Sequence, residues 1–319
     1  MKVKFAVLGD AFVDVVAGTL VHERLPQWGT GVECTQPIQL QPGGSALNTA
    51  THLANLSNRN PTHELHVTLH TAIGSDSFAE MLKAHLAEHK VVLSSPKLEN
   101  ASTGVCIVLS GANDRSFITH YGAVRNFCVE DINEEMVLSA DHVHIGGFYS
   151  CVSLRKKLKP LLEKARKNGI TTSLDTNYDS LKKWDDLEEL YPLIDVLLPN
   201  EVEAMKISHT ESVEAAMAYF AKHVNGLTII KVGASGAVAY CSKTQQYWSQ
   251  TSFPTAVVDV TGAGDSFNSG FLSAWKTNGG DVGDALRWGC GTSSLTVANL
   301  GACSFPLTHE DVLDVVVAS

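Results

Sequence analysis

The chain has 319 residues, 44% of them hydrophobic and 18% charged, which is the composition of a globular protein with a large core. Asp and Glu number 34 against 24 Lys and Arg, and the formal charge of −10 argues against a nucleic-acid partner. The seven cysteines are scattered and never spaced C-x-x-C, so neither a disulfide framework nor a zinc site is indicated. The first residues contain no apolar segment of signal-peptide or membrane-spanning length, so we expect a cytoplasmic protein without a membrane partner.

The first predicted element is a buried strand at residues 5–8, which ends at Gly9 and Asp10. Asp14 follows inside an otherwise apolar stretch, where a carboxylate needs a partner. Backbone groups or solvent would satisfy it, and so would a polyhydroxylated ligand, because a carboxylate can accept hydrogen bonds from two neighbouring hydroxyls. Both interpretations stay open on this stretch alone.

A glycine turn opens the first predicted helix. Residues 18–41 alternate weakly and contain Pro and Gly, which favours short exposed strands. Gly43 and Gly44 then precede apolar residues at helical spacing. Glycine lets the backbone come close to a ligand, and Asn48 in the first turns of the helix offers both a donor and an acceptor.

A strand at 67–73 and a helix at 78–89 come next. Two β-like runs, 103–109 and 116–121, then flank a turn that contains Gly111, Asn113 and Asp114, and together they predict a hairpin. With the preceding 18–41 segment, this hairpin could form a small sheet over a site.

Beyond the hairpin, predicted helices and strands alternate. The strands are at 143–145, 171–174, 196–198 and 228–232, and the helices are at 153–167, from 201 onward and at 213–223. Such alternation predicts a parallel sheet covered by helices on both faces, with ligands at the carboxyl ends of the strands. Polar residues and a glycine follow these strands directly: Asp175, Asn177, Asn200, Glu203, Lys231 and Gly233.

The most informative stretch is the glycine-rich turn at 262–264, which follows a β-prone segment ending at 256–258 and opens a helix. Backbone N–H groups at a helix start lack intrahelical partners and stabilise anions. Asp265 lies at this point, and with a phosphate on the N–H groups its carboxylate can accept the proton of an alcohol. The stretch therefore predicts phosphoryl transfer to a hydroxyl, with simple capping of the helix as the alternative role of Asp265.

Five elements of the chain resemble, in order, the signatures of the ribokinase-like, or PfkB-type, carbohydrate kinases. They are Gly9 with Asp14, Gly-Gly-Ser-Ala-Leu-Asn at 43–48, Asn-Glu-Val-Glu at 200–203, Lys-Val-Gly-Ala-Ser-Gly at 231–236, and the stretch ending Gly-Ala-Gly-Asp at 259–265. The resemblance implies an α/β three-layer sandwich with a mostly parallel central sheet. Residues 1–12, 43–102 and 127–319 would form this main domain, and 13–42 with 103–126 a small β-sheet lid.

The same resemblance implies ATP-dependent phosphorylation of a sugar hydroxyl. Asp265 would be the general base, and the N–H groups of Gly262, Ala263 and Gly264 would form an anion hole. The sugar would be bound by Asp14, Gly43, Gly44 and Asn48, and the nucleotide by Asn200, Lys231, Gly233 and Gly236. Glu203 would hold magnesium through water, and a monovalent cation, commonly potassium in the family, would lie at Asp259, Thr261, Gly301 and Ser304.

Other functions remain open at this point. Ser45 stands where ribokinases usually have lysine, and Gly-Gly-Ser followed by Asn also occurs in proteins similar to adenosine kinase, so a nucleoside acceptor is one alternative. Another is a non-catalytic sugar- or nucleotide-binding regulator of the same fold, which would not need Asp265 as a base. An oxidoreductase is disfavoured, because no G-x-G-x-x-G follows the first strand. The exposed edges of a lid would also allow a homodimer.

Overall fold

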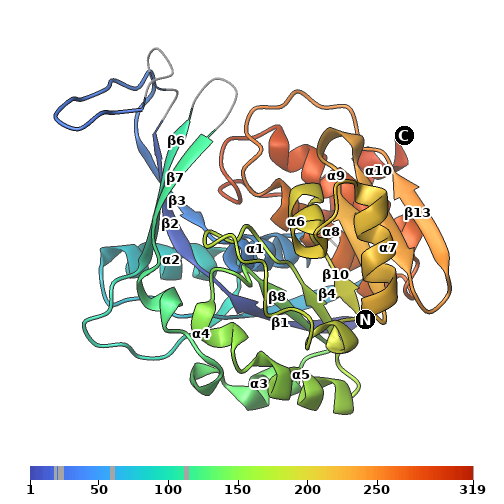
Figure 1. Cartoon of the computed structure of the whole chain (residues 1–319). Coiled ribbons are helices and arrows are strands. Elements are labelled where there is room, and N and C mark those ends of the chain that lie inside the picture. Colours follow the sequence, from blue (N-terminus) through green and yellow to red (C-terminus); the bar gives the residue numbers. More distant parts are fainter. Residues whose placement is uncertain (18–19, 21–24, 58–61, 111–114, 319) are drawn as a thin grey trace.

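The computed structural model describes residues 1–17, 20, 25–57, 62–110 and 115–318, and its strands form two sheets (Figure 1). Within these residues the larger sheet has nine strands. From one edge to the other they are β13 (Gln246–Gln250), β12 (Ala237–Cys241), β11 (Leu227–Lys231), β10 (Val196–Leu197), β9 (Thr171–Leu174), β8 (His142–Gly146), β1 (Lys2–Gly9), β4 (Glu64–His70) and β5 (Val92–Ser94). All neighbours from β11 to β5 are parallel, and β12 and β13 are antiparallel, so the predicted mostly parallel sheet is confirmed.

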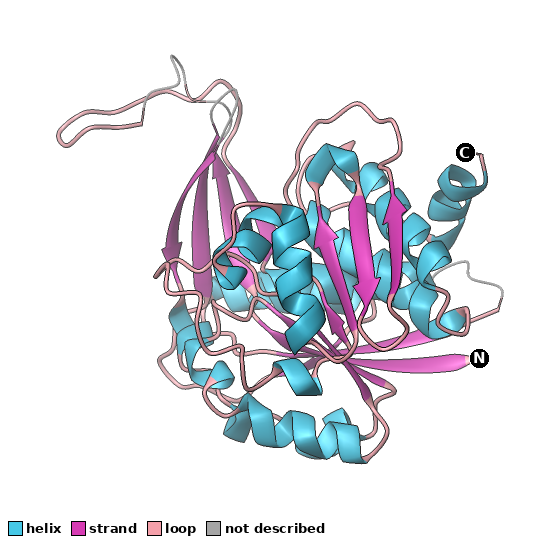
Figure 2. Cartoon of the chain, turned by 45° about the vertical axis from the view of Figure 1, so that its right-hand side comes forward, coloured by secondary structure: helices cyan, strands magenta, loops and turns pink. Residues whose placement is uncertain are grey.

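The alternation of side chains along β1 explains why helices cover both faces of this sheet. Val3, Phe5 and Val7 point to one buried apolar cluster, whereas Ala6 and Leu8 point to the other. The first cluster contains residues of α1 (Ser45–Ser57), α2 (Ser77–Glu88), α8 (Ala263–Thr277), α9 (Val282–Val297) and α10 (His309–Val317). The second contains residues of α3 (Glu134–Leu138), α4 (Val152–Arg155), α5 (Leu158–Lys167), α6 (Glu201–Ser208) and α7 (Val213–His223). Figure 2 shows the sheet between these two layers, which confirms the three-layer α/β sandwich.

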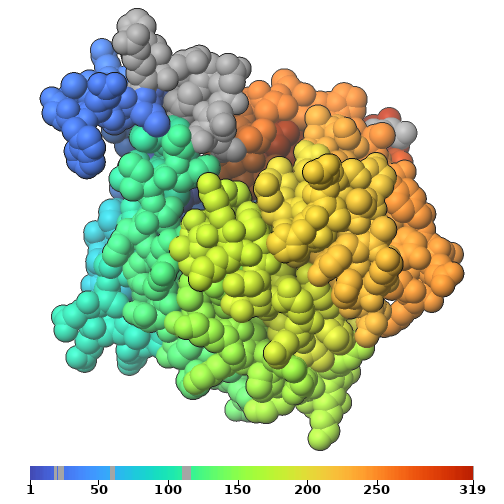
Figure 3. Space-filling view, in the orientation of Figure 1, coloured from blue at the N-terminus to red at the C-terminus, as the bar shows by residue number. Residues whose placement is uncertain are grey.

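The smaller sheet stands apart from the main body (Figure 1). Its order is β3-β2-β6-β7, with β3 (Gln39–Gly43), β2 (Phe12–Ala17), β6 (Gly104–Ser110) and β7 (Arg115–His120). The antiparallel pairing of β6 with β7 confirms the predicted hairpin, whose turn at 111–114 lies outside the described residues, as do 18–19 and 21–24 of the expected strand segment. In the space-filling view the surface is hollowed between this blue-green sheet and the orange-red C-terminal part of the chain (Figure 3).

Two local predictions were wrong. The expected helix at 153–167 is broken into α4 and α5, because the ring of Pro160 would collide with the carbonyl group of Lys156 in a continuous helix. The β-prone residues 256–258 form no strand: the N–H group of Val258 donates to the carbonyl oxygen of Val297 at 2.7 Å, at the end of α9. The β-branched side chains of Val257 and Val258 are typical of a strand, but these residues pair with no strand of the described chain.

Short 3-10 helices complete the connections: η2 (Gly122–Arg125), η3 (Val129–Asp131), η4 (Tyr191–Leu193) and η5 (Gly233–Ser235). None of the described helices has the length and apolar character needed to cross a membrane. The carboxyl ends of β1, β8, β9 and β11 lie along one edge of the large sheet, because these strands run in parallel. The polar residues that follow them are thereby brought to the starts of α1, α6 and α8.

Candidate active site

The first turn of α8 is built on Gly262, which precedes the helix with a φ of +74°. A Cβ at this position would lie 2.7 Å from the Cβ of Ala302, so both the backbone angle and the space require glycine. The N–H groups of Gly264 and Asp265 come in the first turn of α8, where an α-helix provides no intrahelical acceptor. This end of the helix can therefore stabilise an anion, as the sequence predicts.

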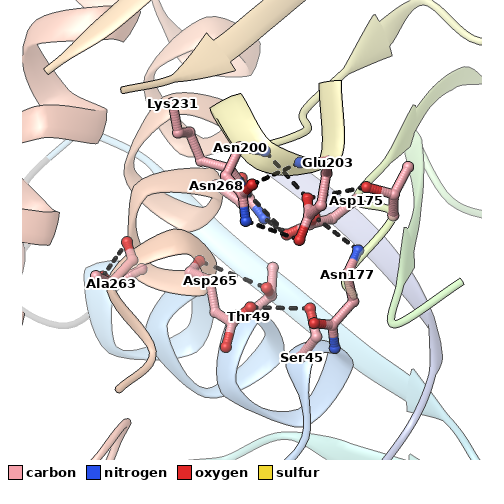
Figure 4. A network of polar contacts seen from close by, with 12 residues as sticks. Ser45, Thr49, Asp175, Asn177, Asn200, Glu203, Lys231, Ala263, Asp265 and Asn268 are labelled. Atoms are coloured by element: carbon pink, nitrogen blue, oxygen red, sulfur yellow. Dashed lines mark hydrogen bonds and ion pairs between the residues drawn. The ribbon is translucent and has the colours of Figure 1, made fainter. Parts of the chain in front are cut away.

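Asp265 points from this turn toward the start of α1 (Figure 4). Its Oδ1 accepts a hydrogen bond of 2.8 Å from Ser45 Oγ, and its Oδ2 accepts one of 2.8 Å from Asn48 Nδ2. Burial raises the pKa of Asp265 to about 6, and Asp175 adds to this effect, whereas Asn48 and Ser45 oppose it. The carboxyl group is thus tuned toward the pH range in which a general base works well.

Gly43 and Gly44 bring the start of α1 close to β2 and Asp14. A Cβ on Gly43 would lie 2.3 Å from Asp14 Oδ2, and one on Gly44, where φ is +100°, would lie 2.9 Å from the Cα of Ala11. Asn48 follows one turn later and is almost fully buried. The four expected sugar-binding residues therefore lie around one end of α1, beside Asp265.

Asn200 and Glu203 form a reciprocal cap at the start of α6. Asn200 Oδ1 accepts from the Glu203 N–H at 2.9 Å, and Glu203 Oε2 accepts from the Asn200 N–H at 3.0 Å. Thr176 Oγ1 also donates to Glu203, and burial together with the nearby Asp175 raises the pKa of Glu203. The Asn200–Glu203 pair is therefore a rigid part of the site.

Lys231, at the end of β11, points toward α8 (Figure 4). Its Nζ lies 3.1 Å from Asp175 Oδ2 and 3.2 Å from Asn268 Oδ1, and only 3.3 Å from the position of a Cβ on Gly264. Asn268 also donates to Asp175. The cation of Lys231 is therefore held beside the first turn of α8.

Gly233 and Gly236 shape the turn between β11 and β12, with φ angles of +55° and +95°. A Cβ on Gly236 would lie 2.0 Å from the carbonyl oxygen of Gln250, at the end of β13. Glycine is therefore required at 236 for close packing of the turn. The expected contact of Gly233 and Gly236 with a nucleotide stays a prediction.

The expected cation-binding residues are brought together, apart from Ser304. Asp259 Oδ1 accepts from the Thr261 N–H at 2.9 Å and from Thr261 Oγ1 at 2.7 Å, and Asp259 Oδ2 accepts from the Gly301 N–H at 3.0 Å. Ser304 is exposed and takes no part in these three bonds. Throughout the described part of the chain, no three His, Cys, Asp or Glu side chains gather as a metal cage.

The sequence prediction missed four residues of this site: Asp10, Asn268, Cys303 and the role of Ser45. Asp10 is 1% exposed and accepts from the Ala46 N–H at 3.0 Å, and burial raises its pKa to about 7. Its carboxyl group fills the space of the missing side chain at Gly147, whose Cβ would lie 2.3 Å from Asp10 Cγ. Its position directly after β1 is the same signal that singled out Asp175.

Comparisons with known proteins identify the family of this chain. Residues 4–309 match the family described as "pfkB family carbohydrate kinase". The chain is 26% identical to the ribokinase of Staphylococcus aureus (strain COL), over 97% of this chain and 99% of that protein. It is 29% identical to the adenosine kinase of Schizosaccharomyces pombe, over 74% of this chain and 76% of that protein.

The fold is also shared with solved structures. The Arabidopsis thaliana ribokinase complexed with ribose and ATP superposes with a TM-score of 0.81, covering 99% of both chains at 24% identity. The family match covers nearly the whole chain, including both glycine turns and Asp265. The chain therefore belongs to the pfkB family of carbohydrate kinases, and it is a phosphotransferase with a hydroxyl group as acceptor.

Proposed function

We propose that this enzyme transfers the γ-phosphoryl group of ATP to a hydroxyl group of a sugar. The observation that carries the proposal is the position of Asp265, in the first turn of α8 but hydrogen-bonded to Ser45 and Asn48 of α1. One carboxylate thus joins an anion-binding helix start to a glycine turn that faces Asp14. This is the arrangement that a base between a phosphate and an alcohol requires.

In the proposed reaction, Asp265 accepts the proton of the acceptor hydroxyl while the oxygen of that hydroxyl attacks the γ-phosphorus of ATP. The bond from that phosphorus to the bridging oxygen breaks, and ADP leaves with the electron pair. The N–H groups of Gly262, Ala263 and Gly264 stabilise the transferring group, for which Ala263 gives up the 3.3 Å hydrogen bond that its N–H donates to the carbonyl oxygen of Val260. A donor of this kind contributes about 3 kcal/mol in other enzymes. Lys231 lies beside Gly264 and adds positive charge on the same side.

Magnesium fits the donors near Glu203. Magnesium takes oxygen ligands and is commonly bound by one or two carboxylates together with phosphates and water, so a full protein cage is not needed. Glu203 is 4% exposed and lies close enough to Asp175 for the two carboxyl groups to repel each other electrostatically. When bound, magnesium would neutralise charge on the phosphates, with Glu203 holding one of its waters and Asn200 placed nearby.

The finer assignments extend the same proposal. Asp14, Gly43, Gly44 and Asn48 bind the sugar, and Gly233 and Gly236 line the nucleotide site. Asp259, Thr261 and Gly301 bind a potassium ion, with Ser304 approaching in the loaded enzyme. Residues 13–42 and 103–126 form a lid that closes over the acceptor and excludes water.

The lid also supports a proposed homodimer. Leu40, Val15, Ile107 and Ile118 are directly paired across all four strands of the small sheet. Because side chains alternate, this row faces away from Asp14, and Leu40 and Ile118 are 51% and 60% exposed. A second copy of the chain that pairs through this face would cover the row.

A nucleoside is the second candidate acceptor. The observation that favours it is the short side chain of Ser45, which bonds Asp265 directly where ribokinases usually carry a lysine. The 29% identity to an adenosine kinase points the same way. Both candidates share the chemistry at Asp265.

The test is ATP turnover in a coupled assay against pentoses, hexoses, sugar acids, sugar phosphates and nucleosides, with magnesium and with or without potassium. We expect strong turnover with one sugar. Turnover with a nucleoside only would show that the acceptor is a nucleoside and not a sugar. No turnover with any compound, although ATP binds, would overturn the proposed function. A potassium requirement would support the cation site, and equal rates with and without it would overturn that assignment.

A further inference from the structure

Cys303 is a buried thiol that contacts the residue next to the proposed base. Its Sγ lies 3.2 Å from Asn48 Oδ1, and Asn48 Nδ2 lies 2.8 Å from Asp265 Oδ2. The thiol is fully buried, and Asn48 is 4% exposed. A line of hydrogen bonds therefore joins Cys303 through Asn48 to Asp265.

The charge of Asp265 determines which end of the Asn48 amide faces it. An ionised carboxylate only accepts hydrogen bonds, so it takes the NH₂ end and leaves the carbonyl oxygen pointing at Cys303. That oxygen is buried and needs a donor. A cysteine thiol is mostly protonated at neutral pH, so the S–H of Cys303 can donate to that oxygen.

His85 and Thr51 are two further polar groups beside the thiol. The Nε2 atom of His85 lies 3.6 Å from Cys303 Sγ and 3.1 Å from Thr51 Oγ1. Burial lowers the pKa of His85 to about 3, so the ring is neutral. The hydroxyl of Thr51 can satisfy this nitrogen, which leaves the S–H of Cys303 for Asn48.

We propose that Cys303 is a positioning residue for phosphoryl transfer, whose S–H holds the Asn48 amide in the orientation that donates to Asp265. This proposal rests on the proposed role of Asp265 as the base. Without the donor, the carbonyl oxygen of Asn48 can turn toward Asp265, where it disfavours the ionised carboxylate. The base is then less often ionised and less firmly aimed at the acceptor.

The first experiment compares Cys303→Ala, which removes the donor, with Cys303→Ser, which keeps one. Cys290→Ala is the matched control, because Cys290 is also a buried thiol but its Sγ donates to the carbonyl oxygen of Gln250, at 3.9 Å, and not to a residue of the site. We expect Cys303→Ala to lower kcat/KM for the acceptor about tenfold, with KM for ATP changed by less than about twofold. Cys303→Ser should recover most of this loss, and Cys290→Ala should keep wild-type kinetics.

A second readout follows the titration of Asp265 itself. The charged and titratable groups around it are Asp10 after β1, Asp14 on β2, Asp175 after β9, Lys231 on β11, and Cys303 with His85 behind Asn48. We expect the NMR titration midpoint of the ¹³C-labelled Asp265 carboxyl to move to higher pH in Cys303→Ala and to return in Cys303→Ser. This titration needs no acceptor, so an enzyme that is silent with every acceptor would overturn the proposed function and still leave Cys303 tested.

A double-mutant cycle separates positioning from a merely structural role. In an Asn48→Ala background, Cys303→Ala should cause no further loss of kcat/KM, because its effect passes through the amide. Additive losses would overturn the proposal, and so would an unchanged Asp265 titration in Cys303→Ala. If Cys303→Ala does not fold, Cys303→Ser alone remains decisive: a midpoint and kcat/KM far from wild type would contradict a donor role.

Discussion

Two helix starts in this molecule use glycine turns for opposite purposes. At α1 the backbone donors are consumed by the protein itself, because Asp10 accepts from Ala46 and Leu47 through its side-chain and main-chain oxygens. At α8 the N–H groups of Gly264 and Asp265 lie in the first helical turn, beside the Lys231 cation. The donors at the start of α1 are thus already bonded to Asp10, whereas those in the first turn of α8 are the ones we expect an anion to bind.

The strongest test of this division is Asp265→Asn, which removes the proposed base, the carboxylate that belongs to α8 and is hydrogen-bonded to α1. The amide cannot accept a proton, so we expect kcat to fall by about 10³ or more while nucleotide binding is retained. Steady-state kinetics and a nucleotide titration of the same preparation measure both quantities. Near wild-type turnover would place the base elsewhere.

The next test replaces Gly262 and Gly44 by alanine, one at a time. Gly262→Ala should lower kcat by about 10²-fold, because both the backbone angle and the contact with Ala302 oppose a side chain there. Gly44→Ala should mainly raise KM for the acceptor. Gly279→Ala is the control for the backbone angle alone, since φ is +78° and nothing lies within 4 Å of the added Cβ. Equal kinetic effects of all three changes would show that only general strain matters.

Asp14→Ala sharpens the assignment of α1 to the acceptor. Loss of a carboxylate that pairs with hydroxyls should raise KM for the acceptor about tenfold or more, and leave KM for ATP within about twofold. Initial rates at varied acceptor and varied ATP give both constants. If the two KM values rise together, Asp14 is structural.

The smallest effect is the pH dependence of the base. Because the pKa of Asp265 is raised to about 6, the carboxylate is ionised above that pH and protonated below it, so kcat/KM for the acceptor should be halved near pH 6 and fall further in acid. Circular dichroism over the same range excludes unfolding as the cause. Constant activity down to the pKa of an ordinary aspartate, about 4, would contradict this prediction.

The parts of the fold that were predictable from the sequence are those whose structure depends on residues close together in the chain. Buried parallel strands read as apolar runs, and glycines with positive φ mark the turns at 43–44 and 262–264. No strand was predicted at β12 or β13. β13 is an exposed edge strand of mostly polar residues, whereas β12 is paired on both sides, by β11 and β13, which no local pattern indicates. The strand predicted at 256–258 was wrong for the opposite reason. Its composition is β-like, but the N–H group of Val258 donates to the last residue of α9 and not to a strand.

Residues of the candidate site were predictable where they lie next to a strand end or a glycine turn, as Asn200, Lys231 and Asp265 do. Asp14 lies inside β2 and was noticed as a carboxylate in an apolar stretch. The partners of these residues were not predictable in the same way. Cys303 meets Asn48 across 255 positions of sequence, and Asn268 meets Asp175 across 93. Such pairs are set by how helices dock on the sheet, and no local spacing encodes them.

The packing of Asp10 against Gly147 also constrains the order in which these two residues can be substituted. A side chain at 147 would occupy the volume of the Asp10 carboxyl group, and φ is +65° there, so any single substitution of Gly147 meets two obstacles. Shortening residue 10 would remove the first obstacle, whereas the φ angle would still favour glycine at 147. The two positions, which follow β1 and β8, are therefore coupled: a substitution at 147 first needs a smaller residue at 10, and it strains the backbone even then.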